Sequence, residues 1–116
     1  AWCREPVVKR YSATAEILEM TLAFPPDSEC FDGHFPTFKV LPGVAQLYFV
    51  RHFARQAFHD FPLTATYRRL KFQKLVLPRE EVKLTVKRVG ESSFSFTMTC
   101  GDKTASSGII EKGDSL

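Results

Sequence analysis

Few cysteines and no long apolar run are found in this sequence, and both absences exclude whole classes of protein. Cys3, Cys30 and Cys100 are odd in number, far apart and without a C-x-x-C pair, so we expect neither a disulfide framework nor a zinc ribbon. No run of about 18 apolar residues occurs, so we expect no membrane span. The first residues lack the apolar core of a signal peptide, which together with reduced cysteines predicts a cytoplasmic protein.

Aromatic residues other than phenylalanine are scarce, since the chain has 11 Phe but only 3 Tyr and 1 Trp. Phenylalanine fills space and can line an apolar channel, but it does no chemistry. The 116 residues are 44% hydrophobic and 25% charged, which is ordinary globular usage and excludes disorder. A chain of this length forms one core, so we expect a single domain over residues 1–116.

The net charge of +3 is unevenly distributed along the chain. Residues 1–33 carry a net −3, residues 34–88 a net +8 and residues 89–116 a net −2. A basic middle is typical of a solvated surface or of a face that meets an acidic partner. No stacked-aromatic or recognition-helix pattern accompanies it, so we expect no nucleic acid. The three histidines show no metal-ligand spacing, so we expect no metal.

Apolar periodicity predicts strands around one long helix. Residues 11–24 alternate with a one-residue slip, which we interpret as one strand with a bulge near Ile17 and Leu18. Residues 42–59 have helical spacing, with apolar residues around most of the girth, which indicates a buried helix. Residues 66–77 are extended and basic, and 80–112 read as an antiparallel meander. We therefore expect an α+β fold in which an antiparallel sheet wraps the helix.

A histidine lies in the loop that precedes this helix. His34 stands between Gly33 and Phe35, and Pro42-Gly43 opens the helix. Free N–H groups at a helix start can polarise a carbonyl oxygen, and a nearby imidazole can remove the α-proton of a thioester. A lone loop histidine is also often a plain structural or surface residue, so the residues alone leave both interpretations open.

This segment resembles a known signature, G-H-F-P-x-x-x-V-x-P-G-V. It is present here as Gly33-His34-Phe35-Pro36, Val40 and Pro42-Gly43-Val44. The signature is similar to that of the 3-hydroxyacyl-acyl-carrier-protein dehydratases of the FabA/FabZ type, which have the hotdog fold. Leu70 to Pro78 and the last hairpin fit the same family. The block from Leu41 to Leu47, followed by an aromatic residue, is similar to the small dehydratases of aryl polyene pigment clusters, the ApeI-like branch.

The resemblance implies a function and a set of site residues. It implies dehydration of a 3-hydroxyacyl thioester to the trans-2-enoyl thioester, in fatty acid or aryl polyene biosynthesis. It implies that His34 is the base, that the Gly43 N–H binds the thioester carbonyl and that the Val40 carbonyl orients the His34 ring. Acyl carrier protein would be the partner, holding the substrate on its phosphopantetheine, with no other cofactor. Two protomers, or a higher oligomer of dimers, would build the sites. We expect Phe35, Phe38 and Phe49 to line the acyl tunnel.

One absence separates this chain from the family pattern. No Asp or Glu occurs from Leu41 to His59, and Tyr48 stands where the family has the second catalytic carboxyl group. A tyrosine hydroxyl donates a proton more readily than it accepts one at neutral pH, so Tyr48 is our second catalytic candidate. It can equally be a ring that fills a pocket wall. The alternatives are therefore a hotdog acyl thioesterase, or a non-catalytic subunit that binds acyl groups or acyl carrier protein.

Overall fold

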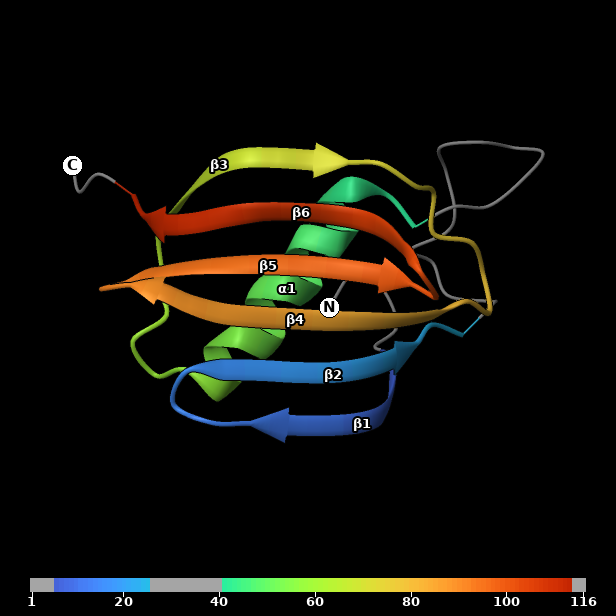
Figure 1. Cartoon of the computed structure of the whole chain (residues 1–116), viewed down its shortest axis with the longest axis horizontal. Helices are drawn as coiled ribbons and strands as arrows, with labels where there is room; N and C mark the ends of the chain where they lie inside the picture. Colours follow the sequence, from blue (N-terminus) through green and yellow to red (C-terminus); the bar gives the residue numbers. More distant parts are fainter. Residues whose placement is uncertain (1–5, 26–40, 114–116) are drawn as a thin grey trace.

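The computed structural model describes residues 6–25 and 41–113 of the chain. Six strands and one helix follow in the order β1(Val7–Ala13), β2(Ile17–Ala23), α1(Gly43–Ala57), β3(Ala65–Phe72), β4(Glu81–Gly90), β5(Ser93–Cys100) and β6(Lys103–Lys112). The strands form one antiparallel sheet in the order β1-β2-β4-β5-β6-β3, and α1 crosses behind it (Figure 1). This confirms the α+β prediction, and the arrangement is that of the hotdog fold.

The core lies between α1 and one face of the sheet. The central strands β4 and β5 bury every second residue, as their alternating sequence predicts. The helix turns Ala45, Phe49, Val50, Phe53 and Ala54 toward the sheet, all buried. Each large side chain buried in this way stabilises the fold by roughly 1.5–3 kcal/mol. One face of the helix is therefore held by packing. The burial around most of its girth that the sequence predicts is only partial in this chain, since Val44 is 66% exposed.

The prediction of a single bulged strand over residues 11–24 is wrong. Residues 11–24 are not one bulged strand but parts of β1 and β2, which pair antiparallel with Ala13 opposite Leu18. Thr14 makes the turn between them, since its Oγ1 accepts the N–H groups of Glu16 and Ile17 at 3.2 and 3.1 Å. The one-residue slip in the alternation of apolar and polar residues therefore marks a tight turn, which contains no glycine or proline. The irregularity in β1 lies instead between Val8 and Arg10.

The segment after β3 returns to the start of the helix. β3 ends at Phe72, five residues before the end of the predicted extended segment, and a single bridge joins Val76 to Leu41. The Leu41 N–H donates to the Val76 carbonyl at 2.8 Å. The chain just before α1 is therefore fixed by residues that follow β3.

The meander of β4, β5 and β6 is confirmed by the structure. Gly101 has φ of +63° in the turn between β5 and β6, a conformation that favours glycine. The helix begins directly after Pro42, as predicted, and ends at Ala57. Its end is closed by the Phe58 N–H, which donates to the Ala54 carbonyl at 2.8 Å.

Candidate functional site

The N-terminus of α1 is the best-defined part of the predicted site. Pro42 occupies the N-cap position in an extended conformation and Gly43 is the first helical residue. The Gln46 side chain, on the next turn, donates from Nε2 to the Leu41 carbonyl at 3.1 Å. The approach to the helix is thus held on both sides, by Gln46 and by the Val76 bridge. Because a helix N-terminus carries partial positive charge, this end can stabilise an oxyanion.

Four of the seven predicted site residues lie outside the described residues. These are His34, Phe35, Phe38 and Val40. Gly43, Tyr48 and Phe49 lie within the described part, on α1. Gly43 and Tyr48 are five positions apart, which places them about 140° apart around the helix axis. One chain therefore presents these two residues on different sides of its own helix.

Tyr48 is partly buried, packs against the edge of the core and lines a small hollow on α1. The hollow has a volume of about 340 Å³ and is lined by Tyr48, Arg51, His52, Arg55 and Gln56. The ring of Tyr48 stacks on that of His52, with centroids 5.8 Å apart and planes 12° apart. The stacking shows that His52, one turn beyond Tyr48, shares a face of the helix with it. Arg51 and Arg55 were not among the predicted site residues, although their spacing of three and seven residues from Tyr48 marks the same face.

Phe49 belongs to the core of the described protein. It is fully buried, and its ring makes an edge contact with that of Phe24 at 5.3 Å and stacks with Phe53 at 6.2 Å. Its ring also contacts that of Tyr48, with centroids 5.0 Å apart. Phe49 therefore connects the hollow around Tyr48 to the core, and its role in lining an acyl tunnel stays a prediction.

Arg68 and Arg69 lie next to each other on β3, and an ion pair neutralises the positive charge of Arg68. Arg68 makes a two-pronged ion pair with Glu111, at 2.6 and 3.1 Å. This pairing lowers the pKa of the Glu111 carboxyl and raises the pKa of the Arg68 guanidinium, mainly through the hydrogen bonds. Arg69 has φ of +53° within an irregularity of the strand. Of the two arginines, Arg68 is thus fixed in position by an ion pair with Glu111 of the same sheet.

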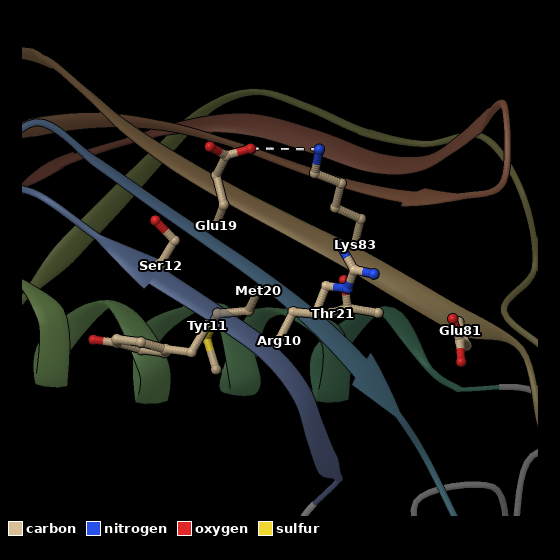
Figure 2. A pocket seen from close by; sticks show the side chains of 8 residues that line it. All are labelled: Arg10, Tyr11, Ser12, Glu19, Met20, Thr21, Glu81 and Lys83. Carbon is tan, nitrogen blue, oxygen red and sulfur yellow. Dashed lines mark ion pairs between the residues drawn. The ribbon is translucent and has the colours of Figure 1, made fainter.

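A wider hollow lies over strands β1, β2 and β4. It has a volume of about 700 Å³, and its lining includes Arg10, Tyr11, Glu19 and Lys83. Figure 2 shows Glu19 and Lys83 directed toward each other, and they form an ion pair at 3.4 Å. The hollow is open to solvent and contains none of the predicted site residues. We therefore take the α1 region as the candidate site.

Other chemistry is limited in the described part of the chain. Among residues 6–25 and 41–113 no group of three or more His, Cys, Asp or Glu side chains could hold a metal ion. Burial raises the pKa of the Cys100 thiol, so it is a poor nucleophile. In the same residues no helix is long and apolar enough to cross a membrane.

Comparison with known proteins shows which family the chain matches and which solved structures it is similar to. Residues 10–109 match the family described as ApeI-like, ApeI dehydratase. No curated protein matches the chain. Among solved structures, the chain is similar to the dehydratase heterocomplex ApeI:P from Xenorhabdus doucetiae, with 25% identity and a TM-score of 0.84, over 93% of this chain and 97% of that one.

A second solved structure is similar as well. It is an uncharacterized protein from Erwinia carotovora subsp. atroseptica, with 33% identity and a TM-score of 0.74. The match covers 93% of this chain and 95% of that one. Each comparison covers 93% of this chain, so both extend well beyond the helix alone.

Proposed function

Since the chain belongs to the ApeI-like dehydratase family, we propose that it removes water from a 3-hydroxyacyl thioester carried on acyl carrier protein. The product is the trans-2-enoyl thioester, made for fatty acid or aryl polyene biosynthesis. The observation that carries the proposal is the family match over residues 10–109, which includes the segment with His34 and the start of α1.

In this proposal the helix start and the loop before it do the chemistry. His34 removes the proton from the α-carbon, and its ring is oriented by the Val40 carbonyl. Negative charge then develops on the thioester oxygen, where the Gly43 N–H donates a hydrogen bond. The C–O bond to the β-hydroxyl breaks as Tyr48 donates a proton, and water leaves. Phe35, Phe38 and Phe49 surround the acyl chain.

The helix geometry supports the assignment of Tyr48 to a second protomer. Gly43 would act through its backbone N–H, which is directed along the helix axis out of the N-terminus, whereas Tyr48 lies about 7.5 Å further along and projects from the side of the helix, so one chain does not direct both groups at one substrate. A site built from Gly43 of one protomer and Tyr48 of its partner removes this difficulty. It also requires an assembly of at least two chains.

A second candidate role is a subunit that needs a different chain for turnover. The observation that favours it is the absence of any acidic residue from Leu41 to His59. The similar Xenorhabdus structure is a heterocomplex, ApeI:P. A different partner could bring the carboxyl group that α1 lacks, while this chain supplies its own helix start.

The test is dehydration of a 3-hydroxyacyl acyl carrier protein, followed by mass spectrometry for the loss of water. We expect His34→Ala to abolish conversion and Tyr48→Phe to slow it about 100-fold, since proton donors contribute about that much. His59→Ala, at an exposed histidine beyond the helix, is the matched control and should keep full activity.

Each other outcome has a defined meaning. Conversion that persists in His34→Ala would contradict the mechanism. Release of a free thiol would identify a thioesterase. A wild-type chain that turns over only after a second hotdog chain is added would support the heteromeric role.

A further inference from the structure

Phe72 is the last residue of β3, and its side chain lies against the first residue of α1. A Cβ atom on Gly43 would lie 2.8 Å from Cε1 and 2.9 Å from Cζ of the Phe72 ring, closer than any real Cβ contact. Figure 1 shows the end of β3 near the start of α1. The ring therefore occupies the space beside the Gly43 backbone that a side chain would otherwise take.

The same ring remains open to solvent. Phe72 is 49% exposed, whereas the core phenylalanines are almost fully buried. One side of the ring contacts Gly43, and its outer side is open for contact with a ligand. Phe72 is thus an apolar wall beside the proposed oxyanion donor.

Two buried polar atoms lie on neighbouring elements, one on β6, which pairs with β3, and one on α1. Ser106 of β6 is opposite Phe72 in the ladder, so both side chains lie on the face of the sheet toward α1. Ser106 is 0% exposed and Gln46, one turn beyond Gly43, is 3% exposed. Within residues 6–25 and 41–113, the Ser106 hydroxyl and the Gln46 Oε1 have no hydrogen-bond partner. Buried polar atoms without partners are costly and concentrate where a ligand or catalytic group is expected.

We propose that Phe72 is the specificity-determining wall of the thioester subsite, pressing the substrate carbonyl against the Gly43 N–H. The inference rests on the proposed function and deepens it. The ring lies on the side of Gly43 from which a Cβ atom would project. In this proposal the α-carbon of the thioester lies against that ring, which admits a linear acyl chain and resists a substituent on that carbon. Glycine at position 43 leaves room for both the ring and the substrate.

The kinetic test compares a linear 3-hydroxyacyl pantetheine thioester with its 2-methyl-branched counterpart. In Phe72→Ala we expect kcat/KM for the linear thioester to fall about ten-fold. The branched thioester should be unchanged or gain, so that the preference for the linear substrate falls about ten-fold or more. Phe72→Leu should recover part of the preference. Tyr11→Ala, a matched loss of an exposed ring on the opposite edge strand, should leave it unchanged.

An unchanged ratio of kcat/KM values for the two thioesters in Phe72→Ala would overturn the inference even if the chain is a dehydratase. A smaller assembly mass in light scattering together with that unchanged ratio would make Phe72 an interface residue instead. A general loss of fold would lower both rates together, and the amide NMR spectrum of Phe72→Ala, compared with that of the wild type, controls for it.

A binding readout keeps the inference testable if the wild-type chain does not turn over. Octanoyl pantetheine, which has no hydroxyl to eliminate, is titrated while the Gly43 amide is followed by NMR. We expect a shift of this amide in the wild type and one at least about three-fold smaller in Phe72→Ala. Equal shifts in both proteins, or none in either, would overturn the role of Phe72, whereas loss of turnover alone would overturn only the proposed function.

Discussion

β1 and β3 are the two edges of one sheet, and both expose apolar side chains. β1 is exposed along its whole length and includes Tyr11, 56% exposed. β3 exposes Leu70 and Phe72, but its Tyr67 packs against the core, and Phe72 reaches the start of α1. Each strand also has an irregularity that interrupts its pairing, as edge strands often do. Exposure alone does not distinguish the two edges, whereas proximity to a helix N-terminus does.

The strongest test of this contrast is the packing beneath β3. Phe96 of β5 is 1% exposed and lies opposite Gly108 of β6, next to β3. We expect Phe96→Ala to lower the free energy of unfolding by about 3–5 kcal/mol, because it leaves a cavity in the core. Urea unfolding measures the loss. The same truncation at Tyr11 on β1 should change stability little, and equal losses at both positions would remove the distinction.

A medium effect is expected where β6 contacts β3. A Cβ atom on Gly108 would lie 2.9 Å from Cε2 of Phe96 and 3.2 Å from Cδ1 of Leu70. We expect Gly108→Ala to cost about 1–3 kcal/mol, because the buried Phe96 ring cannot easily move. Thermal unfolding checks this. Gly90→Ala, whose Cβ would meet only the Ser93 Cβ at 3.4 Å, is the control, and a Gly108→Ala variant as stable as this control would contradict the packing argument.

The smallest effect is expected at two neighbouring carboxylates. Glu80 is bonded to the connection that follows β3, and Glu81 is paired with β1. Glu80 accepts hydrogen bonds from Lys74 at 2.7 Å and from the Leu77 N–H at 2.9 Å, in the connection that follows β3. Glu81 pairs with Lys9 of β1 at 2.8 Å, with both side chains about half exposed. We expect Glu80→Gln to cost about 1 kcal/mol, whereas Glu81→Gln should leave the urea midpoint nearly unchanged.

The pH dependence follows from the same two groups. The hydrogen bond from Lys74 holds the pKa of Glu80 below its ordinary value of 4.5, and that from Lys9 does so for Glu81. A lowered folded pKa means that stability is complete above the ordinary value and is lost as the pH falls through the lowered one. Acid should therefore destabilise the wild type more than Glu80→Gln. An identical loss in both would assign the acid sensitivity to other carboxylates.

Much of the fold could be predicted because its central elements have regular periods. The meander from β4 to β6 alternates strictly, and α1 follows Pro42 with apolar residues on most of its faces. The hairpin of β1 and β2 was missed because Thr14 closes its turn with a side-chain hydrogen bond, where the usual glycine or proline is absent. Periodicity cannot distinguish such a turn from a bulge.

The candidate site also has one part that could be predicted from the sequence and one part that could not. The motif with His34 and Gly43, and the missing carboxyl group at Tyr48, could be identified from residues alone. The contact of Phe72 with Gly43 could not, because the two residues are 29 positions apart and only the packing of α1 against the sheet brings them together. The basic hollow of Arg51, His52 and Arg55 needed the orientation of the helix against its sheet.

The sequence by itself determined the class of fold, the family signature and the absence of acid from the helix, because these depend on residue type and local spacing. Only the tertiary structure decided what surrounds the helix start. Gln46 holds the Leu41 carbonyl, Val76 bridges to the same residue, and Phe72 covers Gly43. These contacts join segments distant in sequence, and their energies come from packing and hydrogen-bond geometry, which no local pattern records.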